Sequence, residues 1–214
     1  RRSEGLVAFL GSGFLSTEEA FLLAKIAALV ESPHRSIWVD SGPARHIPNP
    51  QGGLTGHDAA PNRRGAELAG LVPASGAVSS EDLLLEGAAA KCGAIFIADS
   101  DFGRAAHDPK VVERLREAKF LAVMGWADSP LARVADVVLP VATHAERAGT
   151  FVNSEWRVQR FEQAFPAPPQ VRPGVEALAD LLSRFDPKWS TVTPATVFDL
   201  MAEEVQAFTG LRFR

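Results

Sequence analysis

Short apolar runs recur along this chain, and segments with helical periodicity or polar links separate them. Each run has the length of a strand that is buried on both faces of a parallel sheet. The predicted strands cover residues 6–10, 37–39, 94–98, 120–125 and 136–141. Because they alternate with helices of about a dozen residues, the pattern predicts an α/β fold with a doubly wound, mainly parallel sheet.

Helix start signals lie between the predicted strands. Ser16 and Glu19, three residues apart, form a capping box, and apolar residues follow at helical spacing as far as Val30. Asp108 and Pro109 mark another start, because proline is favoured at the first helical position. Further helices are predicted from residue 79 or 80 to about 93, from about 175 to 185, and from 193 onward.

Two segments break this alternation. Prolines and glycines are frequent in residues 41–71, which predicts a long loop. From Gly149 apolar and polar residues interleave, as in a half-exposed hairpin or an extended arm, so Trp156 and Phe165 are expected to be exposed to water and to promote self-association.

The expected organisation is therefore one α/β body. Residues 1–148 would form the α/β domain, and residues 149–214 would form the extended arm and two closing helices packed on the same body. The chain begins at Arg1 without an initiator methionine, which suggests a fragment of a longer protein.

Composition excludes several classes of function. A net charge of −4 without a strong cluster of lysine and arginine argues against a nucleic-acid partner. No apolar run approaches the roughly 20 residues that a membrane-spanning helix needs, so direct membrane insertion is not expected. The N-terminal residues lack the order of a secretory signal, which favours a cytoplasmic protein.

The single cysteine limits metal and redox chemistry. Cys92 cannot form an intrachain disulfide or supply the thiolates of an iron–sulfur cluster, and its place on a predicted helix favours a small buried apolar role. The histidines show no metal-binding spacing, and neither His57 nor His144 has an activated nucleophile beside it. We therefore expect no catalytic residue and no metal site in this chain.

A glycine turn follows the first predicted strand. Gly11 and Gly13 resemble the opening of a dinucleotide-binding fingerprint, in which a phosphate approaches the backbone at a helix N-terminus. The third glycine position is Ser16, and Asp40 ends the second strand. The turn is open to two interpretations, a free-standing nucleotide-binding module or a tight connection between strand and helix.

Two motifs near the middle of the chain carry a family resemblance. The sequence A-D-V-V-L-P at 135–140, followed by G-T-F-V-N-S-E-W-R-V-Q at 149–159, resembles the molybdopterin oxidoreductase family. Residues 11–30 and 61–66 are similar to the same family. Within it the likeness is greatest to the large iron–sulfur subunit, designated G, of NADH:quinone oxidoreductase, respiratory complex I. The resemblance implies a Rossmann-like domain, with the family's iron–sulfur clusters in the part that would precede Arg1.

Two departures from the family pattern favour the complex I branch. Trp156 stands where the pattern commonly has glycine, and residues 129–134 lack the usual threonine and glutamate. The resemblance then implies a scaffold domain that is inactive alone and binds no cofactor of its own. Its partners would be other subunits of the peripheral arm, through which the cytoplasmic chain would lie beside the inner membrane.

The alternative within the family is a fragment of a molybdenum or tungsten bis-pterin oxidoreductase, such as a formate dehydrogenase. Gly149, Thr150, Asn153 and Arg157 would then line the cleft for the molybdopterin cofactor. Because Asn153, Glu155 and Arg157 alternate in a strand-like segment, they are expected to share one face. That face would bind either an anionic cofactor or a neighbouring domain.

Overall fold

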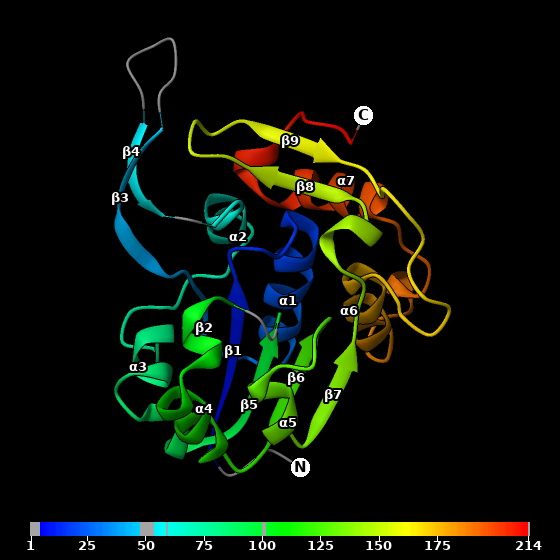
Figure 1. The fold of residues 1–214 in the computed structure, drawn as a ribbon. Helices are drawn as coiled ribbons and strands as arrows, with labels where there is room; N and C mark the ends of the chain where they lie inside the picture. Colours follow the sequence, from blue (N-terminus) through cyan, green and yellow to red (C-terminus); the bar gives the residue numbers. More distant parts are fainter. Residues whose placement is uncertain (1–4, 48–53, 59, 100–101, 214) are drawn as a thin grey trace.

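The fold is built on a five-stranded parallel sheet (Figure 1). The computed structural model describes residues 5–47, 54–58, 60–99 and 102–213. The strands lie in the order β2-β1-β5-β6-β7. Their bounds are β1 Leu6–Ser12, β2 Arg35–Trp38, β5 Cys92–Ala98, β6 Leu121–Gly125 and β7 Val137–Pro140. Each predicted apolar run therefore forms a strand, and the predicted α/β class is confirmed.

Successive residues of the central strands serve two different cores. Phe9 of β1 packs into the cluster on one face of the sheet, whereas its neighbours Ala8 and Leu10 belong to the cluster on the other face. Ile95 and Ile97 of β5 join Ala8 and Leu10. The period of two in strand side chains thus explains why these runs are apolar without interruption.

Helices α1, α2, α6 and α7 contribute to the first core. They comprise α1 Thr17–Leu29, α2 Arg63–Leu68, α6 Gly174–Ser183 and α7 Pro194–Glu204. The predicted capping box of α1 is present, since Ser16 Oγ accepts the Glu19 amide at 3.2 Å and the Glu19 carboxylate accepts the Ser16 amide at 2.8 Å. Two donors at the helix N-terminus are thereby satisfied.

The second core is covered by α3 Ser80–Leu84, α4 Pro109–Arg116 and α5 Pro130–Val134. The helix predicted over 79–93 was too long. It ends at Leu84, because the following residues reach Gly87, whose φ of +71° leaves the right-handed helical region. Cys92 therefore begins β5 rather than lying on a helix, and it is buried as expected, so that burial raises the pKa of its thiol.

The long loop predicted over 41–71 was wrong. Strands β3 Ser41–Ile47 and β4 Leu54–Asp58 pair antiparallel, and α2 follows them. Figure 1 shows this ribbon beside α2, apart from the main sheet. Pro43 lies where the register shifts between Ser41 and Arg45, a place where the missing amide of a proline disturbs the ladder least. The rest of the expected loop at 48–53 and 59 lies outside the described residues.

The last strand of the sheet is not buried as the sequence suggested. β7 is an edge strand, and Val137 and Val138 keep 41% and 43% of their surface exposed. An apolar run of strand length therefore does not by itself show that the strand is buried within its own chain.

The expected arm after residue 148 is a two-stranded hairpin. Strands β8 Gly149–Val152 and β9 Val158–Phe161 pair antiparallel, and β8 lies against α1 and α2. Helices α6 and α7 follow and share the first core with α1. None of the helices in the described part of the chain has both the length and the apolar character that crossing a bilayer requires.

The aromatic packing of α7 gives a test of this core. Phe198 is 1% exposed and contacts Phe208 and Phe213 edge to face. Phe198→Ala should lower the free energy of unfolding by about 3–5 kcal/mol in urea denaturation, because it leaves a cavity. Phe185, 70% exposed, is the matched control, and Phe185→Ala should change stability by no more than about 0.5 kcal/mol. Equal effects of the two substitutions would contradict this assignment of the core.

Candidate functional site

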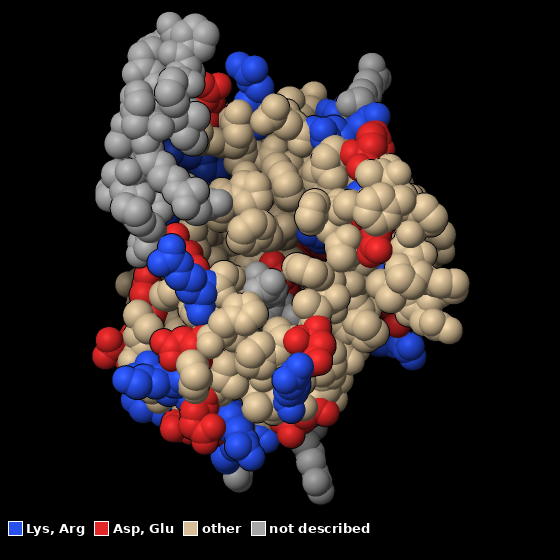
Figure 2. All heavy atoms as spheres, in the orientation of Figure 1, with Lys and Arg blue, Asp and Glu red and all other residues tan. Residues whose placement is uncertain are grey.

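A cavity of about 540 Å³ opens where the parallel strands end. In open α/β sheets, ligands bind outside the carboxyl ends of the strands. Figure 2 shows a hollow in the middle of this face, surrounded mainly by uncharged residues. The cavity is lined by Phe14, Leu15, Pro61, Asp99, Gly103, Met124, Trp126, Val141, Ala142, His144, Arg147 and Phe151. Its walls are therefore largely apolar, with a few polar groups among them.

One side of the cavity is formed by the ends of the adjacent strands β1 and β5. Ser12 Oγ donates a hydrogen bond of 2.5 Å to Asp99 Oδ2 and accepts one of 3.0 Å from the Phe14 amide. Ser12 and Asp99 are both buried, and the φ of Asp99 is +76°, in the left-handed region. Non-glycine residues in this region are uncommon and cluster at functional sites.

Arg147 forms another wall and is held by two partners. Its guanidinium makes an ion pair with Glu19, and its Nη2 donates to the carbonyl of Phe14 at 3.1 Å. Glu19 is fully buried and Arg147 is 9% exposed. Because both charges are removed from water, burying either one without the other would cost free energy.

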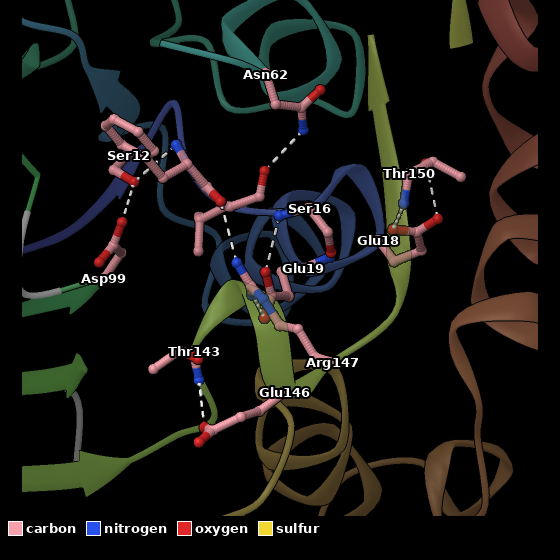
Figure 3. A network of polar contacts seen from close by, with 12 residues as sticks. Ser12, Ser16, Glu18, Glu19, Asn62, Asp99, Thr143, Glu146, Arg147 and Thr150 are labelled. Atoms are coloured by element: carbon pink, nitrogen blue, oxygen red, sulfur yellow. Dashed lines mark hydrogen bonds and ion pairs between the residues drawn. The ribbon is translucent and has the colours of Figure 1, made fainter. Parts of the chain in front are cut away.

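Next to this pair, Glu18 binds the start of β8. The Glu18 carboxylate accepts hydrogen bonds from the Thr150 amide at 3.0 Å and from Thr150 Oγ1 at 2.8 Å. Thr17 Oγ1 donates to the Thr150 carbonyl at 2.9 Å. Burial of Glu18 raises its pKa to about 7, against the lowering effect of the hydrogen bonds from Thr150. We call these contacts of Thr17, Glu18 and Glu19 with Arg147 and Thr150 the N-terminal clamp (Figure 3).

Asn62 ties a third segment to the same place. Its Nδ2 donates to the Leu15 carbonyl at 2.8 Å, and its Oδ1 accepts the Val152 amide at 2.7 Å. A Cβ on Gly65 would lie 2.1 Å from Asn62 Oδ1, so glycine is required for this close approach. The family-like stretch at 61–66 thus joins the strand-to-helix turn to β8.

The glycine turn after β1 is covered by the chain itself. A Cβ on Gly13 would lie 2.3 Å from the Cβ of Ala60, and the Asn62 amide donates to the Gly13 carbonyl at 2.9 Å. The adjoining N-terminus of α1 carries the buried carboxylates of Glu18 and Glu19. A phosphate at this helix terminus would meet two buried acidic side chains instead of free amides.

The sequence-predicted cofactor residues do not gather at the cavity. Gly149 and Thr150 are buried against α1, whereas the side chain of Arg157 is 70% exposed. Asn153 lies in the β8–β9 turn, where its Oδ1 accepts the amides of Glu155 and Arg157 at 2.9 Å each. Among the described residues that line the cavity, none is one of the four predicted.

The expectation that Asn153, Glu155 and Arg157 share one strand face was also wrong. They lie in the turn between β8 and β9, where the alternation of a strand does not apply. Trp156 in the same turn has a φ of +64°, which favours glycine, and the Arg64 guanidinium stacks 4.2 Å from its ring centroid. It is 59% exposed, and Phe165 is 53% exposed, as predicted.

Sequence reasoning missed the polar residues that the fold brings to the cavity. Asp99 had a signal, because it directly follows an apolar strand. The pairing of Glu19 with Arg147 had none, since they are far apart in the chain and only the packing of α1 against the segment before β8 joins them. Within the described residues, no group of three potential ligands is placed to hold a metal ion.

The raised pKa of Glu18 predicts an unusual stability profile. Since the carboxyl binds its proton more tightly when folded than at its ordinary pKa of 4.5, its favourable contribution is complete below that pH. It is lost as the pH rises through about 7, which corresponds to about 3 kcal/mol. Urea unfolding at a series of pH values should show this fall in the unmodified chain and a flatter profile in Glu18→Gln. Glu203→Gln, at an exposed carboxyl, is the control. Identical slopes for Glu18→Gln and the unmodified chain would contradict the prediction.

Comparison with known families places residues 24–184, about three quarters of the chain, in the molybdopterin oxidoreductase family. The chain is 34% identical to the F420-dependent formate dehydrogenase 2 subunit alpha of Methanococcus maripaludis over 120 residues, covering 55% of this chain and 17% of that protein. It is 39% identical to the assimilatory nitrate reductase of Haloferax mediterranei over 93 residues, covering 42% and 13%.

A third relative comes from the branch that the motifs suggested. Over 136 residues the chain is 34% identical to the subunit designated G of the NADH-quinone oxidoreductase of Shewanella oneidensis, covering 56% of this chain and 15% of that protein. The matched part is thus less than one fifth of each of these three relatives. The fold, the motifs and the extent of the family match together show that this chain belongs to the molybdopterin oxidoreductase family.

Proposed function

We propose that this chain is a non-catalytic scaffold domain of a component like the large iron–sulfur subunit of NADH:quinone oxidoreductase. In this role it holds neighbouring domains and subunits of the peripheral arm in place while electrons pass elsewhere, and its partners bring it to the membrane. The observation that carries the proposal is the internal use of the site's polar groups, because Glu18, Glu19 and Asn62 bind the chain's own segments.

The strand-to-helix turn supports this role. Ala60 packs on Gly13 at the point where a bound phosphate would approach the backbone, and the helix N-terminus beside it is capped by Ser16 and Glu19. A nucleotide bound at Gly11 and Gly13 would have to displace this packing. We therefore favour the tight structural turn over the nucleotide-binding module, and titration with NADH tests that choice.

The surface of the β8–β9 turn supports binding to partner subunits. Trp156 holds a left-handed backbone conformation and remains exposed beneath the Arg64 guanidinium. Tryptophan and arginine are among the residues most often found at the energetic centres of protein interfaces. Arg157, beside them, has a 70% exposed side chain and a loose pair with Glu155 at 3.8 Å, so its guanidinium can turn to an acceptor on a partner.

A second candidate function is one wall of the pterin cofactor cleft of a formate dehydrogenase-like enzyme. The cavity at the ends of the strands favours it, because aromatic walls with Asp99 and Arg147 among them fit a flat, polar heterocycle. When bound, such a molybdenum or tungsten cofactor supplies the redox centre. The residues of this chain would bind and orient its organic part.

Arg157→Ala tests the scaffold role in the native assembly. In the scaffold role, the loss of charge-assisted hydrogen bonds should weaken assembly by roughly 1.5–3 kcal/mol, about tenfold or more, without changing the cofactor content. The folding stability of the isolated chain should hardly change, because the exposed pair with Glu155 contributes little. Arg116→Ala, at an exposed arginine on α4, is the matched control. Equal subunit recovery for Arg157→Ala and the unmodified chain would overturn the scaffold role.

Asp99→Asn tests the second candidate at the cavity. It keeps the size of the side chain and removes its charge, so a cofactor wall should lose at least tenfold in pterin affinity while subunit recovery stays normal. In the scaffold role the pterin content of the assembly should be the same for Asp99→Asn and for the unmodified chain. Pterin fluorescence and molybdenum analysis of the purified complex provide the measurement.

A further inference from the structure

The hairpin β8–β9 depends on other elements for its position. In the described part of the chain it forms a separate two-stranded sheet with no strand of the main sheet beside it. Isolated two-stranded hairpins are marginally stable at best. The hairpin is attached mainly by Val152, which is buried in the first core, by the Asn62 bond to the Val152 amide, and by the N-terminal clamp.

The hairpin is also a wall of the cavity. Phe151, which lines the cavity, directly follows Thr150, and Arg147, which lines it too, precedes β8 by two residues. The first turn of α1 thus holds Arg147 through Glu19 and holds Thr150, the neighbour of Phe151, through Glu18 (Figure 3). A change in the attachment of β8 to α1 would open the cavity on this side.

Of the two acidic clamp residues, Glu18 lacks a cationic partner within the part of the chain that the structure describes. Glu19 forms its ion pair with Arg147, whereas Glu18, fully buried, accepts hydrogen bonds from the amide and hydroxyl of Thr150. Burial raises its pKa to about 7. The carboxyl therefore changes its charge in the neutral pH range, in a place where a charge is costly to bury.

Most charged residues on the elements around Glu18 are paired with other residues. On α7, Asp199 accepts the Phe213 amide at 3.5 Å and Glu203 is exposed to water. The strands β1 and β8 carry no charged residue. Several of these charges form ion pairs near α1: Glu19 with Arg147, Lys25 with Glu204 of α7, and Arg63 with Glu67 on α2. Further pairs join Arg172 to Glu176 and Asp180 of α6, Arg184 to Asp180, and Arg160 of β9 to Glu162. Arg64 stacks on Trp156. Hydrogen bonding from Thr150 is thus the main compensation for a charge on Glu18.

We propose that the β8–β9 hairpin is a proton-operated wall of the cavity, fastened to α1 while Glu18 carries a proton and loosened when its carboxyl is ionised. Separation of β8 from α1 admits water to Glu18 and lets the charged form be solvated. Ionisation is therefore coupled to opening by linkage. The device does not depend on whether the cavity receives a partner subunit or a cofactor.

Hydrogen exchange of the purified chain at several pH values measures this opening. After correction for the intrinsic exchange rate, the opening constant of residues 149–161 should rise about tenfold between about pH 6 and about pH 8. Glu18→Gln keeps the shape and hydrogen-bonding capacity of the side chain without the titration, so its opening constant should not change with pH. Helix α4, on the other face of the sheet, serves as an internal control in both proteins.

A second variant keeps the proposal testable if Glu18→Gln does not fold. Thr150→Val removes the hydroxyl that favours the charged form of Glu18, so the pH at which the hairpin loosens should move upward. Carbon-13 NMR of the Glu18 carboxyl in the unmodified chain should show titration near pH 7. The proposal is overturned by a Glu18 titration near its ordinary value of 4.5, by exchange at 149–161 that does not respond to pH, or by equal responses in the chain and in Glu18→Gln.

Discussion

Two buried carboxylates at the start of α1 dictate much of this structure. Glu18 and Glu19 lie side by side there without access to water, and a buried carboxylate is tolerated only when other groups bind it. Arg147 and Thr150 supply those groups from a segment more than a hundred residues away. The position of β8, and with it that of the C-terminal third of the chain, follows from this need.

The same need explains the role of the glycines nearby. A side chain on Gly149 would lie 2.8 Å from the Cβ of Ser16 and 3.0 Å from Glu18 Oε2, and one on Gly65 would meet Asn62. These glycines permit contact between the chain's own segments. In a dinucleotide-binding turn, comparable glycines permit contact with a phosphate.

The relatives of this chain carry the names of proteins with different activities. The relatives include a formate dehydrogenase, a nitrate reductase and a subunit of NADH-quinone oxidoreductase, so the fold alone does not assign the activity. A cavity lies at the strand ends, and Asp99 and Arg147 are among the residues that line it. Exposed Val137, Val138 and Trp156 show where the surface is suited to protein contacts.

Local patterns of polarity were enough to predict the strands of the parallel sheet and the capped start of α1, because these features depend on residues close together in the chain. They did not predict the β3–β4 ribbon, because its prolines and glycines are typical of loops and its strands pair residues that are separated in the chain. They also misjudged the segment that contains Asn153 and Arg157, because it forms a turn in which the period of two does not apply. Packing in three dimensions joined Glu19 to Arg147 and Glu18 to Thr150, because such contacts depend on how whole elements meet and leave no trace in local spacing.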